Sequence, residues 1–386
     1  MIVAGEVSGD RHAAKLAVAL REAGADTDFK FFGAAGPRMR EIGVEAVVRS
    51  DGLAIVGLAE IGRALPMFLR ASRDLKKAAA AHKPDAVILV DFPDFNLKLA
   101  KSLKKQGLTV IYYISPQLWA WRKYRLSTVK KYVDLMITIL PFEKDWYREH
   151  GITNVEYVGS PLAREVHAGK SKEEFCNEHA LDHSKPIISL LPGSRHKEIV
   201  RILPIMLRSA IKIAADRPDV QFVIAMASDR QRPDVKFAIR KTMQNGEKLP
   251  ASLKVVENET YDALNASDAA AVTSGTATLE TGIIGTPMAI VYKTSAINYS
   301  LLEPLISVPH YGLINLIAGE RVAKELIQQD FTAQKLSTEL LRLLQPDENT
   351  AMREKLKRAA EKLGHGGASK RAAEAILRLI ESRTSN

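Results

Sequence analysis

Cysteine is almost absent from this sequence, and so are long apolar runs. Its 386 residues include one cysteine, Cys176, which excludes an intramolecular disulfide and a cysteine-based metal cluster and fits a reducing cytosol. No apolar run reaches the roughly 18–20 residues that a membrane-spanning helix needs. The chain opens with MIVAGEVSGD, which enters a predicted strand at once, so we expect no secretory leader.

Several nucleotide-binding and nucleic-acid-binding motifs are also missing. The turn AGEVSGD is neither the dinucleotide pattern G-x-G-x-x-G nor a phosphate loop followed by lysine, which disfavours nicotinamide enzymes and P-loop ATPases. A net charge of +10 still requires an anionic partner. Without a zinc-finger spacing or an RNA-binding aromatic motif, nucleic acid is the weakest candidate. An anionic membrane surface and a phosphorylated substrate remain.

Short apolar runs alternate with helical patterns along the whole chain. The predicted strands are MIVAG, DFKFFG, DAVILVD, LTVIYYI and DLMITIL in the first half, and PIISLLP, VQFVIAMA, ASDAAAVTS and PMAIVYK in the second. Apolar strands joined by helices predict α/β architecture with parallel sheets covered on both faces. Two such series predict two Rossmann-like, doubly wound domains with an interdomain cleft. We expect the domains at 1–163 and 164–366, and a last helix, about 367–386, that is a candidate to pack back on the first.

Two turns of the first half carry carboxylates at the ends of predicted strands. AGEVSGD contains Glu6, Ser8 and Gly9 where a doubly wound sheet binds ligands, although a plain capped turn explains it too. VDFPDFN places Asp91 at the same edge, where it could serve as a general base for a hydroxyl nucleophile. Asp94 is expected to cap the following helix. A metal held by both aspartates is disfavoured, because no histidine or third carboxylate completes a ligand set nearby.

The stretch SPQLWAWRKYR follows the next predicted strand. Trp119 and Trp121 lie two residues apart, with Arg122 directly behind them. Adjacent aromatic rings and cations suit a sugar ring or an anionic headgroup. The tryptophans could equally be there to fill the interior.

The second half contains two glycine turns between a predicted strand and a predicted helix. Such a turn presents backbone N–H groups at the positive end of a helix, which favours phosphate. One turn alone would be an ordinary connection, but two in the same half favour a nucleotide diphosphate. Glu280, one helical turn after the second, could accept hydrogen bonds from ribose. The turns comprise Gly193, Ser194 and Arg195, and Ser274, Gly275 and Thr276.

Taken in order, these stretches resemble the lipid-A-disaccharide synthases. The resemblance covers the chain to about residue 345 and rests on AGEVSGD, GAAGPRM, VDFPDFN, YYISPQLWAWR, LPFEK, YVGSPL, LLPGSRHKE, SGTATLE and LINLIAG. SPQLWAWR together with PDFN is the most specific part, whereas SGTATLE is shared by many GT-B glycosyltransferases. The resemblance implies the GT-B fold, with the sugar nucleotide held mainly by the second domain.

The resemblance also implies a reaction. Members join UDP-2,3-diacylglucosamine to 2,3-diacylglucosamine 1-phosphate with inversion, giving the β-1,6-linked disaccharide 1-phosphate and UDP, and no metal or other cofactor is expected. By this resemblance, Asp91 is expected to be the base, and Arg195 and the turn at Ser274 are expected to bind the diphosphate. Glu6 and Asn315 match family positions that are linked to activity. Acceptor and sugar contacts are expected from Ser8, Gly9, Trp119, Trp121 and Arg122.

Acylated substrates require an apolar surface, and two stretches are candidates. The stretch that starts at Leu53, LAIVGLAEIGRALPMFLRASRDLKKA, mixes apolar and basic residues and could form a membrane-facing helix pair. AINYSLLEPLISVPHYGLINLIAG, with Glu303 as its one charge, could line the acyl site, although an ordinary core explains either stretch. We expect a cytoplasmic protein, peripheral on the anionic inner face of the bacterial inner membrane. A homodimer is left open.

Two rival functions remain at the level of sequence. One is another GT-B enzyme acting on a UDP-sugar, such as the peptidoglycan N-acetylglucosaminyltransferase or UDP-GlcNAc 2-epimerase, although the WAWR loop and VDFPDFN favour the disaccharide synthase. The other is a non-catalytic protein that binds sugar nucleotides or anionic membrane, which would not need the Asp91 carboxylate.

Overall fold

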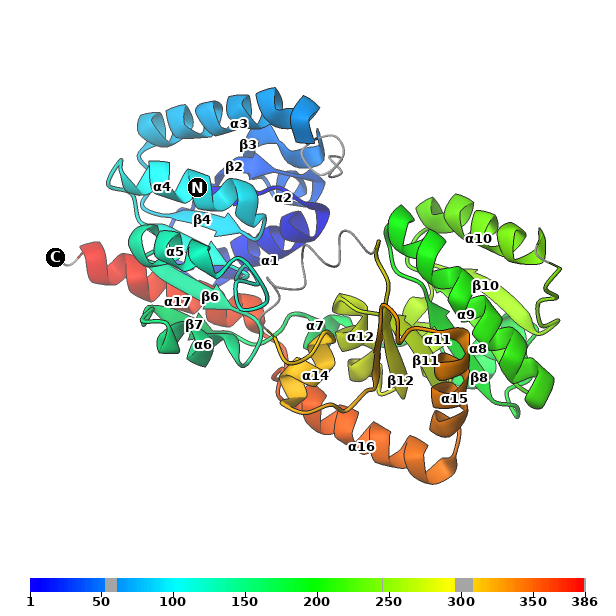
Figure 1. Cartoon of the computed structure of the whole chain (residues 1–386). Helices are drawn as coiled ribbons and strands as arrows, with labels where there is room; N and C mark the ends of the chain where they lie inside the picture. The colour runs from blue at the N-terminus through cyan, green and yellow to red at the C-terminus, as the bar shows by residue number, and fades with distance from the viewer. Residues whose placement is uncertain (53–60, 245, 296–307, 385–386) are drawn as a thin grey trace. The chain divides into compact units, whose positions relative to one another are not determined.

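The computed structural model of the chain describes residues 1–52, 61–244, 246–295 and 308–384. Its contacts divide it into two compact units (Figure 1). Unit 1 comprises Met1–Pro161 and Gly366–Asn386, and unit 2 comprises Leu162–His365. None of the described helices is both long enough and apolar enough to cross a membrane.

Unit 1 is built on a seven-stranded sheet in the order β3-β2-β1-β4-β5-β6-β7, and every pairing is parallel. The order reverses between β1 and β4, where Ala4 pairs with Val90. Ligands of doubly wound sheets bind at such a switch point, beyond the carboxyl ends of the strands. The strands are β1 (Ile2–Ala4), β2 (Phe32–Ala35), β3 (Glu45–Arg49), β4 (Val87–Val90), β5 (Val110–Tyr113), β6 (Leu135–Thr138) and β7 (Val155–Tyr157).

Helices cover both faces of this sheet and create two cores. One core contains residues of α1 and the C-terminal α17, such as Leu16 and Ile376. The other contains residues of α3 to α6, such as Leu75 and Tyr147. α17 is fastened to unit 1 by the Arg371 side chain, which donates a 2.8 Å hydrogen bond to the carbonyl of Val158. The helices are α1 (Val7–Ala23), α2 (Pro37–Glu41), α3 (Ile61–His82), α4 (Pro93–Lys104), α5 (Leu126–Tyr132), α6 (Glu143–Glu149) and α17 (Ala368–Thr384).

Unit 2 repeats this topology with a six-stranded parallel sheet in the order β10-β9-β8-β11-β12-β13. Its switch point lies between β8 and β11, where Leu191 pairs with Val272. The strands are β8 (Ile187–Leu191), β9 (Gln221–Met226), β10 (Leu253–Glu257), β11 (Ala269–Thr273), β12 (Met288–Tyr292) and β13 (Glu325–Ile327). The helices are α7 (Leu162–Glu165), α8 (Lys172–Glu178), α9 (His196–Asp216), α10 (Arg232–Gln244), α11 (Thr260–Ala266), α12 (Thr276–Ile284), α14 (Leu313–Ala318), α15 (Ala333–Leu343) and α16 (Pro346–Glu361).

The strands that sequence reasoning missed are β3, β7, β10 and β13, and each of them is an edge strand. Their residues are mostly partly exposed, as in β3, where both Glu45 and Arg49 lie at the surface. An edge strand has a neighbour on one side only, so its sequence lacks the continuous apolar run that identifies a buried strand.

Candidate functional site

Two carboxylates lie at the switch point of unit 1. Glu6 follows β1 and is exposed, and Asp91 follows β4 and is partly buried. Burial, followed by the nearby charge of Glu6, raises the pKa of Asp91 to about 6, although a hydrogen bond from the N–H of Phe92 opposes the shift. A carboxylate with this pKa is ionised at neutral pH and still basic enough to accept a proton from a hydroxyl group. Asp91 therefore has the chemistry of a general base.

The backbone beside Asp91 is strained. Asp91 has φ of 48°, and Phe92 has φ of 50° and ψ of 57°, so two successive non-glycine residues are left-handed. Each such residue costs on the order of 1–3 kcal/mol. The ring of Phe92 lies against Gly5, where an added Cβ would come within 2.2 Å of Cδ1 of Phe92. Glycine at position 5 therefore lets the turn after β1 and the turn after β4 pack together.

Asp94, three residues further on, has a different environment. It forms ion pairs with Arg122, at 2.8 Å, and with Arg125. Partial burial would raise the pKa of Asp94, but the hydrogen bonds and charges of Arg125 and Arg122 lower it. The prediction that Asp94 caps the helix was wrong, because α4 begins at Pro93 and has no side-chain cap. Asp94 instead attaches the WAWRKYR segment to α4.

The first turn of α1 carries the other predicted residues of AGEVSGD. Ser8 is exposed, whereas Gly9 is buried, and a Cβ added to Gly9 would lie 3.7 Å from the carbonyl oxygen of Val90. Asp10 is buried, and its carboxylate accepts hydrogen bonds from the N–H of Gly36 at 2.9 Å and of Arg38 at 2.8 Å. Asp10 thus fixes the GAAGPRM turn to α1, a role that the sequence did not reveal.

The structure separates the two tryptophans of the SPQLWAWR loop. Trp119 is 4% exposed, and its Nε1 donates a 3.0 Å hydrogen bond to Glu143. Trp121 is 39% exposed, and the Arg122 guanidinium lies 4.0 Å from its ring centroid. Trp119 is therefore an internal anchor of the loop. Of the three residues predicted from this loop, Trp121 and Arg122 are the ones that a ligand can reach.

Glu143 is a buried carboxyl group for which the sequence suggested no role, although it lies in the quoted stretch LPFEK. Burial raises the pKa of Glu143 to about 7, against the hydrogen bonds that it accepts from Trp119 and from the N–H of Leu140. Ser115 also hydrogen-bonds to Glu143 and lies 2.9 Å from the hydroxyl oxygen of Tyr147. This network fixes both ends of the segment from Ser115 to Trp119. An acidic residue in an otherwise apolar strand-to-helix connection was the signal available in the sequence.

In unit 2, the turn after β8 has its N–H groups directed at a carboxylate. The N–H groups of Ser194 and Arg195 both lie 3.3 Å from Oε2 of Glu198, and the Arg195 guanidinium lies 3.0 Å from Oε1. Gly193 has φ of +103°, and an added Cβ would come within 2.7 Å of Glu198. The sequence did not single out Glu198. Glu198 thus caps this turn from within the chain, while the side chain of Arg195 remains exposed.

The turn after β11 lies beside the turn after β8. The hydroxyl of Thr273 donates a 2.9 Å hydrogen bond to the carbonyl of Leu191, which joins the ends of the two strands. The exposed Gly275, with φ of +147°, precedes the exposed Thr276 at the start of α12. The first N–H groups of a helix have no partner within it, so this end suits an anion. The hydroxyl of Ser274 donates a 2.7 Å bond to the carbonyl of Tyr311.

Glu280 and Asn315 lie in different environments. Glu280 is partly buried and accepts a 3.0 Å hydrogen bond from the hydroxyl of Tyr261. Asn315 is fully buried, and its amide nitrogen donates to the carbonyl of Ala323 at 2.8 Å and to Glu325 at 2.9 Å. The amide oxygen of Asn315 accepts the N–H of Ala323. The side chain of Asn315 is therefore directed at the protein, and it can affect a ligand only through the residues it holds.

Glu325 connects Asn315 to the turn after β11. Its carboxylate also accepts the N–H groups of Tyr311 and Gly312, at 3.0 and 2.9 Å. The carbonyl of Tyr311 in turn receives the hydroxyl of Ser274. Asn315 and Glu325 thus support the backbone that holds one of the two predicted diphosphate turns.

Among the described residues, one group has the composition of a metal site. Ligand atoms of Glu178, His179 and Glu259 lie within 4.8 Å of one another. The ammonium group of Lys170 lies 2.6 Å from Glu178 and 2.9 Å from Glu259. Because a cation of the protein already neutralises these carboxylates, the group is an ion-pair cluster of unit 2.

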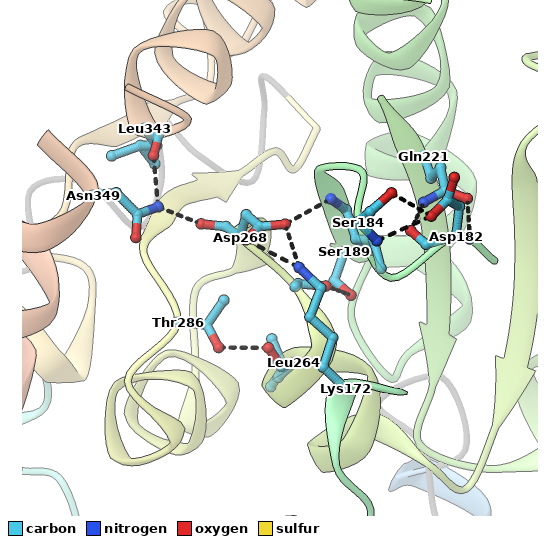
Figure 2. Close-up of polar contacts among 12 residues, drawn as sticks. Lys172, Asp182, Ser184, Ser189, Gln221, Leu264, Asp268, Thr286, Leu343 and Asn349 are labelled. Atoms are coloured by element: carbon cyan, nitrogen blue, oxygen red, sulfur yellow. Dashed lines mark hydrogen bonds and ion pairs between the residues drawn. The ribbon is translucent and has the colours of Figure 1, made fainter. Parts of the chain in front are cut away.

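A second polar network lies at the amino-terminal edge of the unit 2 sheet, at the other end of the strands from the glycine turns. Figure 2 shows its side chains. Asp268 accepts hydrogen bonds from Lys172 at 3.0 Å and from the N–H of Ile187 at 2.9 Å, and Asn349 donates to the carbonyl of Asp268 at 2.7 Å. A surface cavity of about 300 Å³ lies beside this network. These groups bind one another, so the network stabilises the fold.

Comparison with known proteins identifies the family. A family model described as lipid-A-disaccharide synthetase matches residues 1–380. The chain belongs to the lipid-A-disaccharide synthase family. A lipid-A-disaccharide synthase from Syntrophus aciditrophicus (strain SB) is 44% identical over 384 residues, covering 99% of this chain and 97% of the relative. The family predicted from the ordered motifs is confirmed, and with it the activity class, a glycosyltransferase of lipid A biosynthesis.

Solved structures support the fold of this lipid-A-disaccharide synthase family member. MurG from Acinetobacter baumannii is similar with a TM-score of 0.56 at 15% identity, covering 98% of each chain. UDP-GlcNAc 2-epimerase from Neisseria meningitidis, bound to UDP-GlcNAc, is similar with a TM-score of 0.61 at 15% identity, covering 96% of this chain and 97% of the epimerase. The predicted GT-B fold, with two α/β units on parallel sheets, is confirmed.

Proposed function

We propose that this glycosyltransferase joins UDP-2,3-diacylglucosamine to 2,3-diacylglucosamine 1-phosphate, with inversion, to give the β-1,6-linked disaccharide 1-phosphate and UDP. Membership of the family supports synthesis of a lipid A disaccharide. The observation that carries the chemical proposal is Asp91, a strand-end carboxylate whose pKa of about 6 suits proton transfer from a hydroxyl group.

In the proposed reaction, Asp91 accepts the proton of the acceptor 6-hydroxyl while that oxygen forms a bond to the anomeric carbon of the donor. The bond between this carbon and the diphosphate oxygen breaks, and the electron pair leaves with UDP. Attack opposite the leaving group inverts the anomeric centre. Glu6 contributes through its charge, which makes Asp91 a stronger base. Trp121 and Arg122, with the exposed Ser8, are the candidate contacts to acceptor and sugar.

We assign the nucleotide part of the donor to unit 2. The start of α12 presents N–H groups that suit diphosphate oxygens, and Arg195, whose exposed guanidinium pairs with Glu198 here, stabilises the charge that builds up as UDP leaves. Glu280 is assigned to the ribose hydroxyls. The bound UDP-GlcNAc of the Neisseria relative in fold supports a UDP-sugar as donor. With these positive groups in place, the proposed reaction needs no metal ion.

A peripheral contact with an anionic membrane on the cytoplasmic side completes the proposal. On α3, Leu65 and Leu69 are 54% and 60% exposed, and Arg70 and Arg73 are exposed on the same helix. Apolar side chains among cations suit the surface of an anionic bilayer. The rest of the predicted helix pair, 53–60, and much of the predicted acyl segment, 296–307, lie outside the described residues.

The test is UDP release from UDP-2,3-diacylglucosamine, measured with and without the monosaccharide 1-phosphate acceptor in the presence of EDTA. We expect release that depends on the acceptor and survives the chelator. Release that stops in EDTA and returns with a divalent ion would overturn the metal-free reaction. Turnover of UDP-GlcNAc in place of the diacylated donor would assign the chain to a different UDP-sugar specificity.

A further inference from the structure

The carbonyl group of Asp91 accepts hydrogen bonds from two buried side chains. The amide nitrogen of Asn96, on α4, lies 2.8 Å from this oxygen, and the hydroxyl of Tyr112, on β5, lies 2.6 Å from it. Asn96 also lies 3.2 Å from the carbonyl of Val90. Two donors from different elements therefore converge on the peptide between the two left-handed residues Asp91 and Phe92.

Both donors lie where a purely apolar side chain would otherwise be expected. Asn96 and Tyr112 are each fully buried. Within the described part of the chain, the Oδ1 atom of Asn96 is buried without a hydrogen-bond partner. A buried, unsatisfied oxygen is destabilising, and a leucine at this position would avoid the penalty. The donor function of the Asn96 amide explains why an asparagine is found there.

The side chain of Phe92 restrains the same turn from another direction. Its ring centroid lies 5.7 Å from that of Phe95 and 6.0 Å from that of Phe68, and the ring also lies against Gly5. The ring cannot move towards Gly5, and the carbonyl of Asp91 is held by Asn96 and Tyr112. The left-handed conformation is thus fixed by packing and by hydrogen bonds together.

We propose that Asn96 and Tyr112 are positioning residues that hold the Asp91 carboxylate in its proton-accepting orientation by binding the main-chain carbonyl of the same residue. The inference rests on the proposed role of Asp91 as general base. Neither side chain touches the substrate in this scheme. Each restrains the backbone torsions that determine where the carboxylate points and how deeply it is buried.

Tyr112→Phe tests the inference with the loss of one oxygen atom. We expect kcat to fall roughly 5- to 50-fold, a typical cost of misplacing a catalytic group, with KM for the UDP-sugar unchanged. The acidic limb of the pH profile should move to lower pH, because a freed Asp91 becomes more hydrated and its pKa returns towards the ordinary value. Asn96→Leu, which removes the donor at nearly constant size and adds no charge, should act in the same direction, and the double variant should lose less than the product of the two effects.

Tyr113→Phe is the matched control, because it removes a hydroxyl on the opposite face of the same strand. It should leave kcat and the pH profile unchanged. Tryptophan fluorescence measures the folded fraction of unit 1 in each variant, because the three tryptophans of the sequence all belong to unit 1, and kcat is then expressed per folded molecule. If Tyr112→Phe and Asn96→Leu match the wild type in kcat and in the acidic limb while Asp91→Asn is inactive, the positioning role is overturned. If Asp91→Asn is itself fully active, the proposed base fails instead.

Discussion

The two units share one topology but differ in the groups that they place at its switch point. In unit 1 the turns after the two central strands present the carboxylates Glu6 and Asp91. In unit 2 the equivalent turns present Arg195 and the start of α12, and Glu198 accepts the N–H groups of Ser194 and Arg195. Among the described residues, the carboxyl groups with a raised pKa are Asp91 and Glu143, and both belong to unit 1. In unit 2, neighbouring donors hold the pKa of carboxyls such as Glu259 below the ordinary value even where burial opposes this.

This difference shows that the topology of a doubly wound sheet determines where a site lies, whereas the residues of the turns determine which chemical groups the site contains. Near-identical strand order brings two loops together at the same edge of each sheet. Loops with glycine and hydroxyl residues have N–H groups that suit phosphate, and loops with buried carboxylates suit proton transfer. On this basis, changes in unit 1 should alter the pH dependence and rate of the reaction, and changes at the unit 2 turns should alter nucleotide affinity.

The largest effect is expected from Asp91→Asn. Removal of a general base should lower kcat by about 10²–10⁴. In the wild type, kcat/KM should fall as the pH drops below about 6, because protonated Asp91 cannot accept a proton, and the variant should lose this limb. Steady-state kinetics from pH 5 to 8 would measure both effects. Asp145→Asn, an exposed aspartate on α6, is the control. If Asp91→Asn weakened UDP binding and left kcat unchanged, the assignment of proton transfer to unit 1 and of nucleotide binding to unit 2 would be contradicted.

The second effect concerns the buried carboxyl Glu143. Its folded-state pKa, about 7, lies above the ordinary 4.5, so its stabilising contribution is complete below pH 4.5 and is lost as the pH rises through 7. The shift corresponds to about 3 kcal/mol of unfolding free energy. Glu143→Gln does not titrate, so its unfolding free energy relative to the wild type should improve from pH 5 to pH 8. Denaturant unfolding at both pH values is the measurement, and a difference independent of pH would refute the prediction.

The third effect concerns nucleotide affinity in unit 2. Arg195→Ala should weaken UDP binding by about 10- to 100-fold, the equivalent of one hydrogen bond to a charged group. The acidic limb assigned to Asp91 should stay where it is. Calorimetric titration with UDP would measure the affinity. Lys212→Ala is the control, because Lys212 is exposed on α9, the helix that follows Arg195. Equal affinities for both variants would remove Arg195 from the diphosphate site.

The smallest kinetic effect is expected from Asp268→Ala, at the opposite edge of the unit 2 sheet. The substitution leaves Lys172 and the N–H of Ile187 without this acceptor, at a cost of about 1–3 kcal/mol of stability. Thermal unfolding should show the loss, while kcat and UDP affinity stay at wild-type values. A change in UDP affinity without a change in stability would show that the two edges of this sheet are not independent.

The sequence alone predicted the central strands, and it failed at the edges. The runs that form β1, β4, β8 and β11 are continuous and apolar because those strands are buried on both faces. The candidate turns could be found because each directly follows such a run. The edge strands lack such a run. β13 has only the sequence ELI, and β3 has a charged residue at each end, so neither could be recognised as a strand from its apolar residues.

The ordered motifs determined the family and the positions of the candidate turns, because both depend on residues that are close together in the chain. The tertiary structure decided which side chains are free to act. It directs Trp119 inward to Glu143, encloses Asn315 among its own hydrogen bonds, and brings Tyr112 to the carbonyl of Asp91. These contacts join residues 8 to 24 positions apart. Spacing in the sequence cannot reveal them, because the distance between such residues is set by the packing of strands and helices.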